Sequence, residues 1–176
     1  MISMDLKECA TDKCPNLKTI KKSLGKAVMN DDFLKVCQIL ENLDNNTKHR
    51  IFEKTYQGRT LLDWATRKGN LDITKIFLEN GANVNDENIT SHQTPIYGAG
   101  GNGNLQVVQH LISCQANINI VDATGRSPLS HVACEGKTDI VRLFLNVGIN
   151  NTDEGDNRGW TALCLAATRG PKQSIE

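Results

Sequence analysis

The sequence predicts an all-α solenoid in which pairs of short helices stack as repeated units. The first observation is a set of hydroxyl residues spaced 34, 33 and 34 apart along the chain. These residues are Thr60, Thr94, Ser127 and Thr161. The second observation is a set of glycines with the same spacing, Gly69, Gly103, Gly136 and Gly170. A regular period of this length indicates one supersecondary unit that stacks on copies of itself.

The first helix of each unit begins after the hydroxyl residue, which stands where an N-cap belongs. Its oxygen can accept hydrogen bonds from the free amides of the first turn. Pro95 and Pro128 follow at the first helical position, where the missing amide hydrogen costs nothing. A glycine suited to the left-handed conformation then ends the helix. The predicted first helices are 62–68, 96–102, 129–135 and 163–169.

The second helix of each unit carries apolar residues at helical spacing, as in Leu71, Ile73, Ile76 and Phe77. A phrase rich in asparagine closes it, Gly-Ala-Asn-Val-Asn in one copy and Gln-Ala-Asn-Ile-Asn in the next. The connection that follows is typical of a hairpin-like turn. Neither helix can bury its apolar face alone, so the units must stack.

The repeat spacing divides the chain into an N-terminal arm (1–22), a repeat domain (23–170) and a C-terminal tail (171–176). The predicted repeats are 23–54, 55–88, 89–121, 122–155 and an incomplete 156–170. In the first copy Asp31 replaces the glycine, and the connection through 45–47 is longer than elsewhere. We interpret this copy as an N-terminal cap. Because the fifth copy lacks a second helix, we expect the chain to be a fragment of a longer protein or a shortened product.

These motifs resemble the ankyrin repeat, whose signature joins a Gly-x-Thr-Pro-Leu-His opening to a Gly-Ala-x-Val-Asn close. The resemblance spans about residues 24–170 and is most specific between 55 and 170. It implies an ankyrin-repeat solenoid whose helix-turn-helix units are joined by hairpin-like loops. The signature histidine is replaced by Asp63, Tyr97, Ser130 and Cys164. We therefore expect its bonds between repeats to be lost and the stability to be modest.

The composition argues against a membrane protein, a disulfide-stabilised secreted protein and a metal-binding protein. The chain has equal numbers of basic and acidic residues, and its N-terminus has neither a signal peptide nor an apolar membrane span. Its six cysteines lack the spacing of a metal site or a disulfide framework. We therefore expect a monomer in the cytoplasm, with the nucleus as an alternative, and no contact with a membrane.

Two patterns that could indicate chemistry conflict with the repeat register. The run from Gly98 to Gly103 spells G-x-G-x-x-G, but no strand precedes it and Gly98 lies inside a predicted helix. We interpret its glycines as a soft joint in the stack, since each costs about 1 kcal/mol relative to alanine in a helix. The four histidines, with Cys114 and Cys134, have no zinc spacing. The sequence therefore predicts no catalytic, cofactor-binding or metal residue, and no cofactor.

The resemblance implies a binding face, because ankyrin-repeat proteins usually hold partners on a concave face made of turn tips and first helices. Carried onto this chain, that map selects Tyr56, Arg59, Arg67, Lys68, Gln93, Asn102, Arg126, Glu135, Arg158, Trp160 and Arg169. The set contains six cations and one carboxylate. It therefore predicts a protein partner with an acidic or phosphorylated segment, anchored by Tyr56 and Trp160. Nucleic acid is disfavoured by the neutral overall charge, and no small-molecule substrate is expected.

The leading functional hypothesis is a non-catalytic protein-binding module. Within it, the chain is similar to short inhibitors of Rel/NF-κB transcription factors, which implies an inhibitor of a signalling or transcription factor. The alternatives are a substrate-recognition adaptor of a ubiquitin ligase and a regulatory ankyrin segment of a larger enzyme or channel. The resemblance also implies hydroxylation at Asn119 by an asparaginyl hydroxylase.

Overall fold

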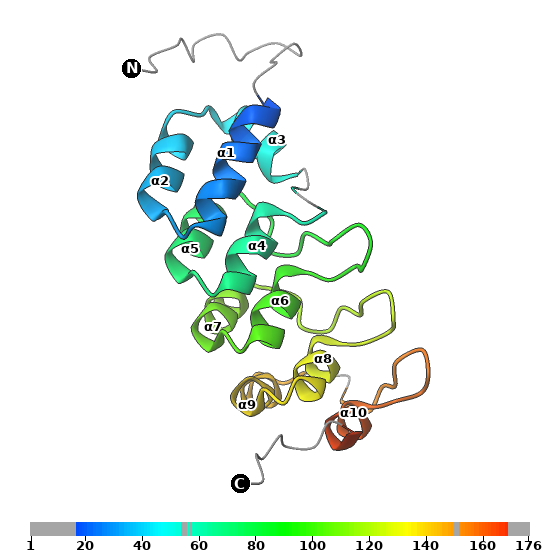
Figure 1. Ribbon diagram of the computed structural model, residues 1–176. Coiled ribbons are helices and arrows are strands. Elements are labelled where there is room, and N and C mark those ends of the chain that lie inside the picture. Colours follow the sequence, from blue (N-terminus) through cyan, green and yellow to red (C-terminus); the bar gives the residue numbers. More distant parts are fainter. Residues whose placement is uncertain (1–16, 54–55, 57, 150–151, 169–176) are drawn as a thin grey trace, which may run out of the picture.

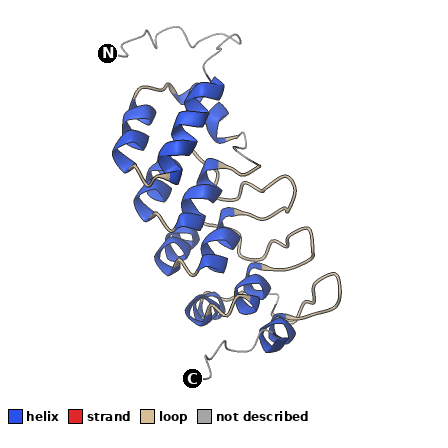
Figure 2. Ribbon diagram, viewed as in Figure 1, coloured by secondary structure: helices blue, strands red, loops and turns tan. Residues whose placement is uncertain are grey.

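The computed structural model describes residues 17–53, 56, 58–149 and 152–168, and all regular elements in these ranges are helices. They form a stack with an inner row (α1, α4, α6, α8, α10) and an outer row (α2, α5, α7, α9), and long loops project beyond the inner row (Figures 1 and 2). This confirms the predicted all-α repeat fold. The helices are α1 (Leu17–Met29), α2 (Phe33–Glu41), α3 (Asn45–Phe52), α4 (Leu61–Lys68), α5 (Leu71–Glu79), α6 (Pro95–Asn102), α7 (Leu105–Ser113), α8 (Pro128–Cys134), α9 (Thr138–Asn146) and α10 (Ala162–Thr168).

Helices α4, α6 and α8 begin after the repeated hydroxyl residue and have their C-cap at, or one residue before, the repeated glycine, while the last of these glycines lies outside the described residues. The hydroxyl of Thr60 accepts a hydrogen bond from the amide of Asp63 at 3.0 Å, which caps α4. Gly69 ends that helix in the left-handed conformation, with φ of 77°. In the first copy Asp31 takes the equivalent position, with φ of 55°. Thr94 differs, because its buried hydroxyl caps nothing and has no partner in the described part of the chain.

The N-terminal region contains two helical segments that the predicted boundaries did not specify. Helix α1 begins at Leu17, inside the predicted arm 1–22. The predicted long connection through 45–47 is the first turn of α3, which Asp44 caps by accepting from the amide of Thr47 at 2.9 Å. The segment is helical because its far end reaches the core, where the ring of Phe52 lies 5.3 Å from that of Phe77.

The core consists of two apolar clusters along the stack. Leu24, Val28 and Phe77 belong to the first cluster, and Val108 and Phe144 belong to the second. Leu78 packs against both clusters and so links them. Each fully buried side chain of this kind contributes about 1.5–3 kcal/mol. Among the described residues, no helix has the length and apolar character needed to cross a membrane.

The glycines of α6 are explained by close packing of neighbouring helices. A Cβ on Gly98 would lie 2.4 Å from Cγ of Arg67 on α4, and one on Gly100 would lie 2.6 Å from Cγ1 of Val132 on α8. Both glycines are buried against these neighbours, and the G-x-G-x-x-G run continues to Gly103, the left-handed C-cap of α6. Whether this repeat is also a soft joint stays a prediction.

The expected loss of bonds between repeats is wrong at Tyr97. This side chain is fully buried, and its hydroxyl lies 2.7 Å from the carbonyl oxygens of Ile120 and Arg126 in the connection to the next repeat. Burial raises the pKa of Tyr97, so its hydroxyl remains a hydrogen-bond donor. Tyrosine therefore joins two repeats from the position of the signature histidine.

Candidate partner-binding face

The surface formed by the loop tips and the exposed sides of α4, α6, α8 and α10 is called the inner face below. It corresponds to the concave face that the sequence predicts as the binding site. The loops lie side by side along one edge of the stack (Figure 1). Their tips are organised by three residues at equivalent positions, Asn88, Asp122 and Asp156.

Each of these three side chains closes its own turn. The Oδ1 atom of Asp122 accepts from the amides of Thr124 and Arg126 at 2.8 and 3.1 Å. Burial opposes the charged form of Asp122, but hydrogen bonds led by those from Thr124 and Gln93 lower its pKa below the ordinary value. The carboxylate is therefore retained inside the turn. These organising residues were not predicted, although Asn88, Asp122 and Asp156 recur at a regular spacing.

The loops are also bonded to one another. Gln93 donates from Nε2 to Oδ2 of Asp122 at 3.1 Å, and the amide of Ala123 donates to the carbonyl of Ser91 at 3.0 Å. The next pair repeats the arrangement, since the amide of Asn157 donates to the carbonyl of Thr124 at 3.0 Å. Such cross-links hold the loop tips in one arrangement before any partner binds.

The arginines of the second repeat are paired with a carboxylate that the sequence map did not include. Asp63 is 2% exposed. It accepts from Nη1 of Arg59 at 2.9 Å and from Nε of Arg67 at 3.1 Å. Arg67 also donates to Oε1 of Gln93 at 3.1 Å, and the guanidinium of Arg59 lies 5.8 Å from the ring centroid of Trp64. Asp63 therefore replaces the signature histidine as an electrostatic anchor.

The other predicted cations are mostly paired as well. Nζ of Lys68 lies 3.0 Å from Oδ2 of Asp31, and Nε of Arg126 lies 3.5 Å from Oδ2 of Asp156. Arg158 is exposed and takes part in no ion pair within the described ranges. The five predicted cations in the described part are Arg59, Arg67, Lys68, Arg126 and Arg158, and the carboxylates beside them or on the same face are Asp31, Asp63, Glu135 and Asp156. The positive charge of the inner face is therefore largely compensated.

The two predicted aromatic anchors have different roles. The ring of Tyr56 packs against α1, where a Cβ on Gly25 would lie 2.6 Å from it, so this tyrosine supports the N-terminal core. Trp160 is 43% exposed at the last loop tip. Ile89 is 76% exposed at a loop tip, 88–94, that is one residue longer than the equivalent tips 122–127 and 156–161. Ile89 was not predicted, although the longer segment between Asn88 and Thr94 was a signal in the sequence.

The remaining predicted residues are placed as follows. Asn102 is exposed and donates from Nδ2 to the carbonyl of Arg67 at 2.9 Å, and Glu135 is exposed at the end of α8. Asn119 is exposed, and its amide donates to Oδ1 of Asn117 at 2.9 Å. Its hydroxylation stays a prediction. Arg169 lies outside the described residues. Within those residues, no group of three or more His, Cys, Asp and Glu is placed to hold a metal ion.

Comparison with known proteins identifies the repeats. A model of three ankyrin repeats matches residues 96–176, and a model of a single ankyrin repeat matches 57–89. A transient receptor potential channel homologue (subfamily A, member 1) of Caenorhabditis elegans is 32% identical over 119 residues, which are 68% of this chain and 10% of that protein. A probable E3 ubiquitin-protein ligase of rice is 39% identical over 85 residues, 48% of this chain and 16% of the ligase.

The probable 26S proteasome regulatory subunit p28 of Saccharomyces cerevisiae is 29% identical over 131 residues, 74% of this chain and 57% of that protein. The chain thus spans only part of the length of each of these relatives. The two family models together match more than half of the chain, in the same register as its stacked helix pairs. The chain belongs to the ankyrin-repeat family.

Proposed function

We propose that the chain is a non-catalytic module that holds a partner protein on its inner face. Ankyrin repeats form a protein–protein interaction module, which is the coarse function of this chain. The observation that carries the finer proposal is the row of cross-bonded loop tips, from which Ile89, Arg158 and Trp160 remain exposed. Tryptophan and arginine are the residue types enriched among binding hot spots.

The hydrogen bonds between loops favour this function energetically. Ordering loops and side chains on binding weakens affinity, and a surface that is ordered beforehand avoids part of that cost. The pairs of Asp63 with Arg59 and Arg67 restrain two long side chains in the same way. The inner face therefore has the character of a preorganised binding surface.

Fewer cations are free to bind an acidic partner than the sequence indicated. Four of the five predicted inner-face cations that the structure describes are in ion pairs. We therefore expect the attraction for an acidic partner to come mainly from Arg158. An acidic residue of the partner at this position would gain a contact without displacing an internal carboxylate. The ionic-strength dependence of binding should accordingly be modest.

The test is affinity capture from cell extract with the full chain, followed by affinity measurement with the identified partner. Trp160→Ala and Arg158→Glu should each weaken binding by at least about tenfold. Arg142→Glu is the matched control, because Arg142 is exposed on the outer helix α9. A partner that binds both inner-face variants as tightly as the unaltered chain would exclude this face as its site.

Arg59→Glu and Arg126→Glu are unsuitable for this test. Either change would place a new carboxylate beside Asp63 or Asp156 and disturb the fold. A loss of binding could then come from partial unfolding.

The role of the module within a pathway is a separate proposal. An inhibitor of a signalling or transcription factor, a ubiquitin-ligase adaptor and a regulatory segment of a channel or enzyme all use such a module. Relatives named as a channel and as a ubiquitin ligase support the regulatory segment and the adaptor, and neither these two names nor that of the proteasome subunit favours the inhibitor. The captured partner would decide among them. Light scattering and fluorescence microscopy would test the expected monomer and its location in the cytoplasm or nucleus.

A further inference from the structure

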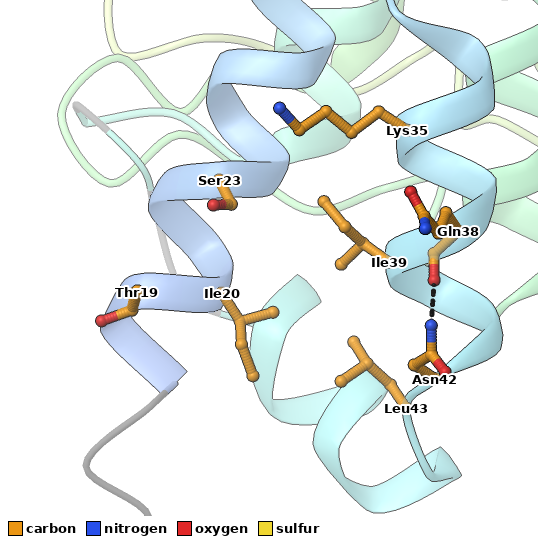
Figure 3. Close-up of a pocket in the computed structure, with 8 residues that line it drawn as sticks. All are labelled: Thr19, Ile20, Ser23, Lys35, Gln38, Ile39, Asn42 and Leu43. Atoms are coloured by element: carbon orange, nitrogen blue, oxygen red, sulfur yellow. Dashed lines mark hydrogen bonds between the residues drawn. The ribbon is translucent and has the colours of Figure 1, made fainter. Parts of the chain in front are cut away.

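A groove lies between α1 and α2, at the N-terminal end of the stack (Figure 3). Its floor is apolar, formed by Ile20 of α1, Ile39 of α2 and Leu43 just after α2. Its rim is polar and includes Thr19, Ser23, Gln38 and Asn42. The Lys35 side chain extends from α2 toward α1 at one end of the groove (Figure 3).

The described residues that line this groove all come from α1, α2 and the two residues directly after α2, and none of them belongs to α4 or α5. Apolar surface continues beside it at Leu34, which is 78% exposed one helical turn before Gln38. The groove has a volume of about 270 Å³. This is below the roughly 300–1,000 Å³ usual for small-molecule sites. An open apolar groove of this size suits a few side chains of a protein segment better than a metabolite.

The charge on the α1 side of the groove is positive, whereas α2 carries both Lys35 and the exposed Glu41. Helix α1 contains no acidic residue, and it carries exposed Lys18, Lys22 and Lys26. Two carboxylates near Lys35 in sequence are already engaged. Asp31 pairs with Lys68, and Asp32 caps α2 by accepting from the amide of Lys35 at 3.0 Å. No ion pair within the described ranges includes these lysines of α1 or the ammonium group of Lys35.

The apolar floor, Lys35 at one end of the groove and the exposed lysines of α1 together specify an occupant. Amphipathic helices bind such grooves by inserting apolar side chains spaced three or four residues apart. Carboxylates that flank the apolar side chains would meet Lys35, which lines the groove, and would be attracted by Lys22 and Lys26, which are exposed on α1 outside the lining. We propose that the groove between α1 and α2 is a second docking surface of this chain, which binds an acidic amphipathic helix of a partner protein.

This surface is distinct from the inner face and does not depend on the proposed function of that face. The probe is a fluorescein-labelled amphipathic peptide with leucines at helical spacing and glutamates on either side of them. Fluorescence anisotropy with the full chain should show saturable binding that weakens as salt is added. A matched peptide with lysines in place of the glutamates should not bind.

Charge reversal at the groove tests the site without disturbing the core. Lys22→Glu combined with Lys35→Glu should weaken peptide binding by at least about tenfold, since both side chains are exposed. Lys75→Glu on α5 is the control and should leave binding unchanged. In methyl NMR spectra the peptide should shift the signals of Ile20, Ile39 and Leu43.

Four results would overturn the proposal. The first is equal binding of the acidic and basic peptides, and the second is no saturable binding of the acidic one. The third is a set of peptide-induced shifts at the inner face, around Ile89 and Leu163. The fourth is evidence that the groove has another occupant. If deletion of residues 1–14 changes the methyl chemical shifts of the groove in the unbound chain, the occupant is the N-terminus of the chain itself. If these shifts change with protein concentration, the occupant is a second copy of the chain.

Discussion

The cations of the inner face and the lysines of the N-terminal groove have the same charge but different surroundings. Arg59 and Arg67 converge on Asp63, a carboxylate that is 2% exposed. Lys22 and Lys26 project from a helix that has no acidic residue. The inner face therefore has ordered cations with little excess charge, whereas the groove has excess charge with few internal contacts.

This difference has a consequence for recognition. Ordered, compensated arginines contribute shape and directed hydrogen bonds, and they tolerate neutral partners. Exposed, uncompensated lysines attract acidic partners over longer distances and are screened by salt. The number of cations in the sequence cannot distinguish compensated arginines from uncompensated lysines. The carboxylate that compensates Arg59 and Arg67 is Asp63, which stands where the ankyrin signature has histidine.

Removal of Asp63 should give the largest effect. Asp63→Ala leaves Arg59 and Arg67 without their shared partner, and we expect the free energy of unfolding to fall by about 2–3 kcal/mol, at the low end for a buried pair because both guanidiniums are partly exposed. Urea denaturation measures the change. Lys68→Ala, which breaks an exposed pair, is the control and should cost no more than about 1 kcal/mol. Equal effects of the two changes would contradict the special role of Asp63.

Gly98→Ala should be next in size. The added methyl group would overlap Cγ of Arg67, and the overpacking cost of about 1–3 kcal/mol should exceed the gain in helix propensity of about 1 kcal/mol. Thermal and urea denaturation of Gly98→Ala, Arg67→Ala and the double variant give the coupling between the two positions. The double variant should be more stable than the sum of the single changes indicates. Strict additivity, or a stabilising Gly98→Ala, would show that the space is not limiting.

Stability should also fall as the pH drops below about 6.5, because of His131. Burial is the largest influence on its pKa and lowers it below the ordinary value of 6.5. The charged groups that also act on it are Glu135, Asp122, Arg67 and Arg126. The unfolded chain therefore takes up this proton at a higher pH than the folded chain, and the stabilising contribution is lost as the pH falls toward the folded pKa.

Urea denaturation at several pH values would measure this effect. His131→Gln should flatten the dependence between pH 6.5 and the folded pKa, because glutamine does not titrate. If the variant keeps the same slope as the unaltered chain, other groups cause it. The effect should be smaller than that of Asp63→Ala.

The smallest effect on stability should come from the groove lysines. Lys22→Glu and Lys26→Glu change exposed side chains for which the described residues offer no ion pair, so the free energy of unfolding should stay within about 0.5 kcal/mol. Differential scanning calorimetry checks this. A larger loss would mean that these lysines have internal partners, and the contrast with Arg59 and Arg67 would disappear.

The fold was predictable because its signals are local and repeated. The cap at Thr60, the left-handed Gly69 and the apolar spacing of Leu71, Ile73 and Phe77 each specify a helix end or face within a few residues. Helix α3 was missed because its reason is tertiary. Phe52 reaches Phe77 across the stack, and the repeat template provides no helix there.

The sequence allowed us to predict which residues lie on the loop tips, but not which of their charges are compensated by neighbouring carboxylates. The template correctly placed Trp160 and Arg158 on exposed loop tips, but it also selected Tyr56, which packs on α1. Ile89 was missed because the template treats every loop alike, while the tip of this loop, 88–94, has one residue more than the other two tips.

The sequence by itself determined the repeat unit, its helix boundaries in most copies and the order of the stack, because capping and apolar periodicity act over a few residues. Only the tertiary structure decided which charges cancel and which side chains remain available. Asp63 meets Arg59 and Arg67 within one repeat, but Gln93 reaches Asp122 only because successive loops lie in contact. Ion pairing and burial depend on distances between units, and a one-dimensional pattern does not contain those distances.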